Sequence, residues 1–221
     1  MALLDEDRTV VLLGLSADGP GPRSGGAAAR AAPRGSADRV LGLAQQALAL
    51  AGVELGDCDA VAVSRGPGSL TGLRVGIGTA RGLAVGAGKP LYGVSSLRAI
   101  AAGLGEGPPV LALIDAGRGE LYGGLYTPGD PPAALGEDRV GSPEEFARAI
   151  EARPVRIAGS GARRYREHFP GAQTPGWAYE EFLAVGVARV ASALARAGGD
   201  VDPAPRYLRR QSTPLRFEES S

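Results

Sequence analysis

The stretch that decides the fold is residues 59–94, DAVAVSRGPGSLTGLRVGIGTARGLAVGAGKPLYGV. It opens with alternating residues rich in valine and alanine, which are typical of a buried strand. A Gly-Pro-Gly turn breaks the strand, and Ser69 follows at the position of a helix N-cap. The pattern predicts a helix over residues 70–87 that ends at Gly88, followed by a second strand.

The predicted helix is unusual because it contains five glycines, Gly72, Gly76, Gly78, Gly82 and Gly86. Each glycine costs about 1 kcal/mol relative to alanine, so the set costs about 4–5 kcal/mol. Glycines at i and i+4 share a face and form smooth grooves that another backbone can approach. The helix is apolar nearly all round, so we expect burial on more than one side. The second side packs either against this chain or against a partner, and the helix pattern leaves both open.

The composition is that of an ordinary globular protein, with 221 residues, 44% hydrophobic and 22% charged. Lys+Arg and Asp+Glu both number 24, which disfavours an autonomous nucleic-acid binder or a membrane-surface protein. The single cysteine excludes an intrachain disulfide and a cysteine-rich metal site. Residues 5–7 are acidic, which is wrong for a signal peptide, and no long apolar run is present, so we expect a cytoplasmic protein.

Two α/β lobes are predicted from the order of the remaining elements. In the first lobe (residues 1–102) we expect a strand at 9–16, a weak strand at 27–32 and a helix at 36–51. A Gly/Pro-rich linker at 103–109 precedes the second lobe (residues 103–221). Further elements are expected there: strands at 110–115, 120–126 and 155–158, a helix after Ser142, and a long helix at 179–197. This division allows the long helix to pack back on the first lobe.

A short repeat supports duplication of one architecture. Asp5 and Arg8, like Asp115 and Arg118, show the spacing D-x-x-R between two apolar strands. Matching hairpins at the start of two lobes predict an actin-like arrangement. Asp5 and Asp115 would then lie in an interlobe cleft able to hold magnesium and phosphate, although acids in hairpin turns are common in any α/β protein.

The glycine turn resembles a dinucleotide-binding loop in part. Gly66 and Gly68 follow a strand and precede a helix, but Thr71 occupies the third-glycine position of the dinucleotide fingerprint. No G-K-[ST] follows, which excludes a P-loop. The turn formed by Gly66, Gly68 and Ser69 is either an anion-binding turn or only a tight turn with a cap, and the second reading is favoured.

No catalytic or metal-binding constellation emerges. His168 is the single histidine and has no neighbouring ligand pattern, so a surface histidine is the better interpretation. Cys58 precedes a strand and is interpreted as a small packed residue. The serines lack a G-x-S-x-G elbow and a histidine partner. We therefore assign no catalytic residue and no metal ligand.

Three motifs resemble the TsaB (YeaZ) family. Residues 62–84, AVSRGPGSLTGLRVGIGTARGLA, are similar to its GRGPGSFTGLRIG-type signature. Residues 115–122, DAGRGELY, are similar to its D-A-R-x-G-E-[VL]-Y motif, and residues 205–209, PRYLR, to its P-x-Y-L-R tail motif. The resemblance covers nearly the whole chain in order and length.

The resemblance implies a two-lobed α/β fold of the actin-like ASKHA class, with duplicated ribonuclease H-like halves. It also implies a non-catalytic subunit that dimerises with TsaD and activates it, in the complex that adds threonylcarbamoyl to the tRNA adenosine beside the anticodon. TsaE is the ATPase of that complex, tRNA is reached only through the complex, and a homodimer forms when the partner is absent. The chain alone would bind no cofactor, while ATP or ADP with magnesium at the complex interface stays open.

The family's first two helices form the partner interface, which assigns it to the helices at 36–51 and 70–87. The predicted contact positions are Val40, Leu43, Ala44, Ala47, Gly72, Gly76, Thr79 and Leu83. The last four form an i, i+4, i+7, i+11 stripe.

Two departures from the family pattern bear on function. Glu6-Asp7-Arg8 replaces the usual Thr-Ser-Thr, and acids there would repel a phosphate. Ser36 replaces the usual histidine of the first helix. TsaD carries two metal-binding histidines, which a chain with one histidine cannot supply. Two alternatives remain: a small ATP-binding, kinase-like enzyme of the same fold, and a metallopeptidase-like protein.

Overall fold

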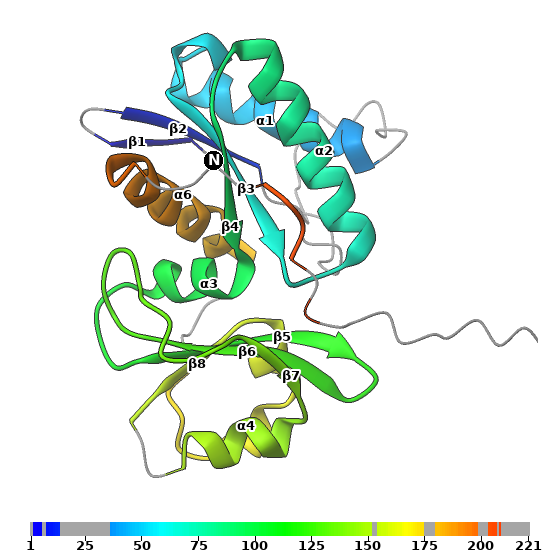
Figure 1. The fold of residues 1–221 in the computed structure, drawn as a ribbon, viewed down its shortest axis with the longest axis vertical. Coiled ribbons are helices and arrows are strands. Elements are labelled where there is room, and N and C mark those ends of the chain that lie inside the picture. Colours follow the sequence, from blue (N-terminus) through cyan, green and yellow to red (C-terminus); the bar gives the residue numbers. More distant parts are fainter. Residues whose placement is uncertain are drawn as a thin grey trace, which may run out of the picture.

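The computed structural model describes residues 2–5, 8–13, 36–151, 154–174, 180–198, 203–206 and 208. In these ranges two four-stranded sheets lie at different levels, with helices outside and between them (Figure 1). The strands are β1 (Ala2–Asp5), β2 (Arg8–Leu13), β3 (Ala60–Gly66), β4 (Leu91–Ser95), β5 (Val110–Gly117), β6 (Glu120–Tyr126), β7 (Arg139–Gly141) and β8 (Arg156–Ala158). The α-helices are α1 (Ser36–Ala51), α2 (Leu70–Ala87), α3 (Ser96–Leu104), α4 (Pro143–Ala149), α5 (Ser160–Arg164) and α6 (Glu180–Arg196). Two 3₁₀ turns are η1 (Leu55–Asp57) and η2 (Arg166–His168).

The deciding stretch folds as the sequence predicts: β3, then α2, then β4. The Ser69 hydroxyl accepts a hydrogen bond from the backbone N–H of Gly72, and Gly88 ends the helix in the left-handed conformation at φ 64°. Strands β1 to β4 form one sheet, called sheet A, and β5 to β8 form the other, called sheet B. In sheet A, β2, β3 and β4 are parallel, and β1 is antiparallel to β2. A short glycine turn and a single helix are therefore sufficient to connect two adjacent parallel strands.

Alternation along β3 divides the first lobe into layers. Val61 and Val63 face one side, where they meet α1 and α2. Ala60 and Ala62 face the other side, where they meet α3 and α6. Side chains of successive strand residues point to opposite faces, so a strand buried on both faces has no polar side.

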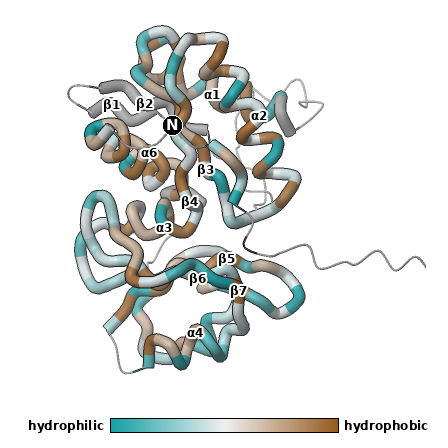
Figure 2. Tube along the Cα trace, viewed as in Figure 1, coloured by the Kyte–Doolittle hydropathy of each residue, from teal (hydrophilic) through white to brown (hydrophobic). Residues whose placement is uncertain are grey.

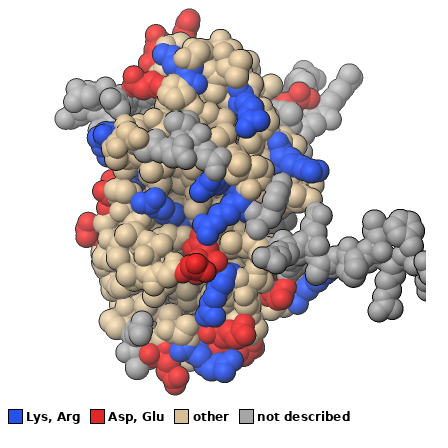
Figure 3. All heavy atoms as spheres, viewed as in Figure 1, with Lys and Arg blue, Asp and Glu red and all other residues tan. Residues whose placement is uncertain are grey.

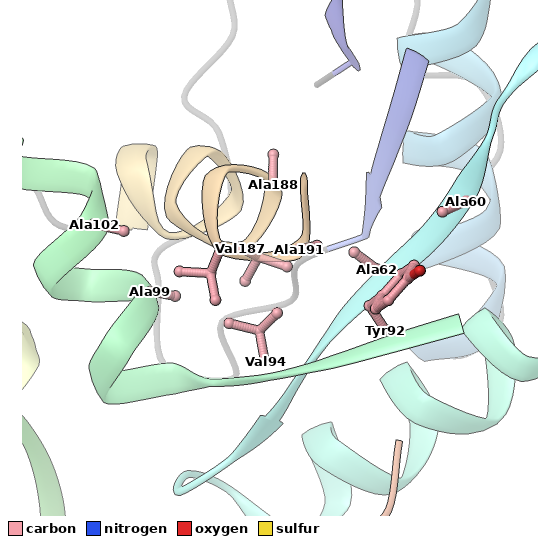
Figure 4. Packing of buried hydrophobic residues seen from close by; sticks show 10 residues of the cluster. Ala60, Ala62, Tyr92, Val94, Ala99, Ala102, Val187, Ala188 and Ala191 are labelled. Atoms are coloured by element: carbon pink, nitrogen blue, oxygen red, sulfur yellow. The ribbon is translucent and has the colours of Figure 1, made fainter. Parts of the chain in front are cut away.

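Helix α6 completes the first lobe although it lies late in the chain. Figure 4 shows Val187 and Ala191 on the side of α6 that faces Val94 of β4. Alanines on α6 and on β3 allow the helix to approach the sheet closely. The face of sheet A opposite to α1 and α2 is thus covered by a helix about a hundred residues further along the chain.

Helix α3 is shared between the two sheets. Ala99 and Ala102 belong to the cluster with α6 and sheet A. Leu97 and Ile100, on the opposite side, pack against β5, β6 and β8 of sheet B. The outer face of sheet B is covered by α4 and α5, with Phe146 of α4 in that cluster. Figure 2 shows hydrophobic segments concentrated on the strands and on the elements between the sheets.

The predicted linker at 103–109 is held in place by one arginine. Arg156, at the start of β8, donates hydrogen bonds to the carbonyl oxygens of Leu104, Gly105, Glu106 and Pro108 at 2.9–3.1 Å. The guanidinium thus satisfies carbonyls at the C-terminal end of α3, which have no partner within the helix.

The two hairpins do not hold equivalent places, contrary to the repeat proposed from D-x-x-R. In sheet B the order is β7-β6-β5-β8, and the first hairpin strand, β5, lies beside the parallel strand β8. In sheet A the order is β1-β2-β3-β4, and the second hairpin strand, β2, lies beside the parallel strand β3. Asp5 therefore lies one strand before β2, the strand with a parallel neighbour in sheet A. Asp115 lies near the end of β5, which is itself the strand with a parallel neighbour in sheet B.

Other elements differ in smaller ways. The weak strand expected at 27–32 and residues 14–16 of the first predicted strand lie outside the described residues. β7 and α5 were not predicted, since three and five residues are too few to show a hydrophobic period. In the described ranges no helix is both long and apolar enough to cross a membrane.

Candidate functional site

Exposed apolar side chains gather on α1 and α2. Six large hydrophobic residues are exposed among those whose side chains are described, and only Leu135 lies elsewhere. The five on these helices, with the exposed fraction of each, are Leu41 (38%), Leu43 (50%), Leu50 (91%), Leu70 (41%) and Val85 (78%). Isolated surface leucines need no explanation, but five on two adjacent helices form a candidate interaction surface.

The glycines of α2 add open space to this surface. A Cβ atom built on Gly78, Gly82 or Gly86 would have no neighbour within 4 Å. Nothing in the described fold therefore requires these three positions to be glycine, although each lowers helix stability. We call these three glycines and the five exposed apolar residues the helical surface. Figure 2 shows hydrophobic segments along both helices at the edge of the molecule.

The predicted contact residues of α1 fall mostly on the wrong side. Val40 (2% exposed), Ala44 (3%) and Ala47 (8%) are buried, and Val40 and Ala44 pack in the cluster with β3 and α2. A partner cannot reach these three residues without opening the lobe, so we correct that part of the prediction. Leu43 is half exposed and stays a candidate.

The predicted contact residues of α2 lie along its flank. Gly72, Gly76, Thr79 and Leu83 are all of intermediate exposure, between the buried side and the open one. Leu83 also packs against the internal cluster of the lobe. The most open side of α2 is instead the one that carries the three glycines of the helical surface.

The predicted anion-binding turn is used in other ways. Gly66 is buried at φ 105°, and a Cβ there would lie 2.8 Å from the carbonyl oxygen of Arg206. The Ser69 hydroxyl caps α2. Only Gly68 has open space around it. Because the tail covers one side of the turn, Gly66, Gly68 and Ser69 do not form an open cradle for an anion.

Asp5 and Asp115 lie in different sheets. Asp5 pairs with Arg8 at the turn of the β1–β2 hairpin, before β2 begins to pair with β3. The Asp115 carboxylate accepts hydrogen bonds from Arg164 and from the backbone N–H of Gly117. A cleft shared by these two acids stays a prediction.

A different cavity of about 640 Å³ lies between the lobes. It is bounded by the end of β4, the start of α3, the segment 133–138 and α6. Three arginines line it: Arg65, Arg98 and Arg206. Figure 3 shows positive side chains near the middle of the face in view, with negative ones beside them.

One buried carboxylate organises the edge of this cavity. The Asp138 side chain is 3% exposed and forms an ion pair with Arg206 at 2.7 Å. It also accepts hydrogen bonds from the Tyr126 hydroxyl at 2.6 Å and from the Ser95 hydroxyl at 3.5 Å. Burial, followed by the hydrogen bond to Asp138, raises the pKa of Tyr126 well above its usual value. No sequence pattern indicates a role for Asp138, because it lies in a segment without periodicity.

The remaining candidates for chemistry are ordinary. His168 lies at the surface of the second lobe, with Nδ1 3.2 Å from a carboxylate oxygen of Glu144. Cys58 is buried, and desolvation raises the pKa of its thiol, which disfavours the nucleophilic thiolate. Among the described residues no three His, Cys, Asp or Glu side chains are grouped to hold a metal ion.

Comparisons with known proteins agree with this architecture. The YeaZ structure from Pseudomonas aeruginosa is 34% identical, with a TM-score of 0.66 over 80% of this chain and 85% of that one. A second P. aeruginosa structure, described as an uncharacterized protein with similarity to peptidase YEAZ, is 32% identical, with a TM-score of 0.65 over 80% and 86%. Together with the two sheets and the shared helices, these likenesses define a two-lobed, actin-like α/β protein.

Sequence comparisons narrow the class further. The family model described as "TsaD: tRNA N6-adenosine threonylcarbamoyltransferase" matches residues 19–194. The Escherichia coli K12 protein described as "tRNA threonylcarbamoyladenosine biosynthesis protein TsaB" is 46% identical over 97 residues, 42% of each chain. The chain belongs to the TsaB (YeaZ) family within this larger TsaD-like group. The match spans less than half the length of the E. coli relative.

Proposed function

We propose that this protein is a non-catalytic subunit for threonylcarbamoyladenosine synthesis on tRNA, and that it acts by pairing with a TsaD-type protein through the helical surface. The observation that carries the proposal is that five of the six exposed large apolar residues with described side chains lie on α1 and α2. The similarity to the E. coli protein described as a tRNA threonylcarbamoyladenosine biosynthesis protein supports a role in that synthesis.

The open glycines of α2 support close helix–helix packing as the mode of contact with the partner. A glycine without a neighbour allows a partner helix to approach the backbone of α2 more closely than any larger residue would. The cost of about 1 kcal/mol for each helical glycine is then offset only in the complex. A helix pair of this kind fits an apolar helix pair on the partner, as in a four-helix arrangement.

We propose a non-catalytic role because of the surroundings of the histidine and the cysteine. His168 is held at the surface by acids, and the thiol of Cys58 is buried, so neither is placed to act on a substrate. We expect the isolated chain to leave tRNA unmodified and to contribute by binding the catalytic protein.

The test is size-exclusion chromatography with light scattering on the full chain, alone and mixed with TsaD from the same organism. We expect a mixed species with the wild type, and a homodimer when TsaD is absent. Leu50→Asp and Val85→Asp place a charge in the helical surface and should weaken binding at least tenfold, about 1.4 kcal/mol.

Leu135→Asp is the matched control, because Leu135 is 52% exposed but lies outside the helical surface. It should bind TsaD as the wild type does. Equal loss with all three variants would contradict the assignment of the surface. A wild-type chain that never forms a mixed species would overturn the proposed function itself.

A further inference from the structure

The tail segment, defined as residues 203–206 with Leu208, bridges the two lobes. On the first lobe, the backbone N–H of Arg206 donates to the carbonyl oxygen of Arg65 at 2.7 Å. On the second lobe, the Arg206 guanidinium donates to the Asp138 carboxylate at 2.7 Å. Leu208 packs against the cluster of α3 and sheet B. A single residue, Arg206, thus contacts both lobes.

The contact on the first lobe lies where α2 is set up. Arg65 is followed by Gly66, and the carbonyl oxygen of Arg206 fills the space where any other residue at position 66 would carry its Cβ. Leu73, in the first turn of α2, lies 3.0 Å from the same position. The tail therefore packs on the turn that fixes how α2 leaves the sheet.

The contact on the second lobe is strong because the carboxylate has little access to water. Asp138 is 3% exposed, and a buried charge without a partner is costly. Arg206 supplies the opposite charge, and Tyr126 and Ser95 donate the remaining hydrogen bonds. Loss of Arg206 would leave a nearly buried anion without its cation, so the second lobe favours a bound tail.

We propose that Arg206 is a positioning residue that couples the second lobe to the helical surface, by holding the turn at residues 65–69 and with it the start of α2. The coupling to a partner rests on the proposed function, whereas the positioning of the turn does not. In this arrangement the second lobe sets the direction of the helix that the partner meets. The tail acts as an interlobe strap rather than as a cover for the cavity.

The test compares three variants of the full chain: Arg206→Gln, Arg206→Lys and Arg166→Gln. Arg166→Gln removes the same charge from an exposed arginine of the second lobe and is the matched control. The first readout is amide hydrogen exchange, followed by mass spectrometry. We expect at least tenfold faster exchange in peptides covering residues 64–73 with Arg206→Gln, a smaller change with Arg206→Lys, and none with the control.

The second readout is binding to TsaD, for which we expect a three- to tenfold loss with Arg206→Gln and no loss with Arg166→Gln. Faster exchange at residues 64–73 together with weaker binding supports the proposal. If exchange stays unchanged, or rises equally in peptides of α4, the proposal that Arg206 holds the turn at residues 65–69 is overturned. Faster exchange with unchanged binding overturns the coupling. If the wild type does not bind TsaD, the proposed function fails, and hydrogen exchange alone decides whether Arg206 positions the turn.

A cover for the cavity would behave differently. If the tail only shields apolar surface, then Leu208→Ala should accelerate exchange more than Arg206→Gln does, and the acceleration should centre on α3 and sheet B. That outcome would also overturn the proposal.

Discussion

Helices α2 and α6 are both rich in small residues, but the space around their glycines differs: Gly186 of α6 is tightly packed, whereas Gly82 of α2 is open. In α6, a Cβ on Gly186 would overlap the backbone carbonyl oxygen of Ala99 in α3. In α2, a Cβ on Gly82 would meet nothing within 4 Å. The glycine of α6 is explained by packing within the chain, whereas the glycine of α2 is not. A small-residue face therefore marks a close approach, and only the fold shows whether the approaching backbone belongs to the same chain.

Gly186→Ala should have the largest effect. The added methyl group forces α3 and α6 apart, and α3 is shared by both lobes. Overpacking against backbone costs about 3 kcal/mol or slightly more, since neither helix can yield locally. Urea unfolding should show this loss of unfolding free energy. A loss below about 1 kcal/mol would mean that the two helices slide apart easily, and the contrast with α2 would weaken.

Arg156→Gln tests a second contact within the chain, between β8 and the segment that follows α3. The guanidinium donates to four carbonyl oxygens at the end of α3 and in the linker, and a glutamine amide cannot reach them all. We expect a loss of about 2–3 kcal/mol, because hydrogen bonds from a charged donor are stronger than neutral ones. The check is urea unfolding beside Arg148→Gln, an exposed arginine of α4 that should change little.

Tyr126→Phe should cost about 1–2 kcal/mol near neutral pH, because Asp138 loses a hydrogen-bond donor. It should also change the pH dependence. The pKa of Tyr126 is raised in the folded protein, so the neutral phenol stabilises the fold fully below pH about 10, and this stabilisation declines as the pH rises further. Unfolding free energies from pH 8 to 11 should fall less steeply in the variant, and equal slopes would contradict the buried hydrogen bond.

Gly82→Ala should have the smallest effect, and of the opposite sign to Gly186→Ala. Alanine is favoured over glycine inside a helix by about 1 kcal/mol, and the new methyl group meets open space. Thermal and urea unfolding of the isolated chain should therefore show a gain in stability. The measurement needs two protein concentrations, because a homodimer through this side would hide the gain at the higher one. A loss at both concentrations would show that the outer side of α2 is not open.

Much of the fold was predictable from local patterns. The alternation at β3, the cap at Ser69 and the stop at Gly88 placed three elements nearly to the residue. Each of these signals acts within a few residues along the chain. The short elements β7 and α5 were missed, because their positions depend on packing against β5 and β6 rather than on a period of their own.

The candidate site was predictable only in part. The sequence assigned the interface to α1 and α2, and that assignment stays a prediction. It also placed Val40, Ala44 and Ala47 on the partner side, although these three residues are buried within the lobe. Helical spacing shows which residues share a face and does not show which face is outside. The contacts of Asp138 with Arg206 and Tyr126 join residues far apart in the sequence, and no local pattern announces them.

The position of α6 has a consequence for how the protein is made. Helix α3 follows β4 directly, but the face of sheet A that it shares with α6 lacks the larger part of its cover until α6 has left the ribosome, about a hundred residues after the end of β4. At roughly 5–20 residues per second, the apolar side of β3 and β4 stays exposed for about 5–20 seconds. The nascent first lobe thus exposes apolar surface of the kind that chaperones bind during synthesis, and its packing is complete only when the second lobe is nearly finished.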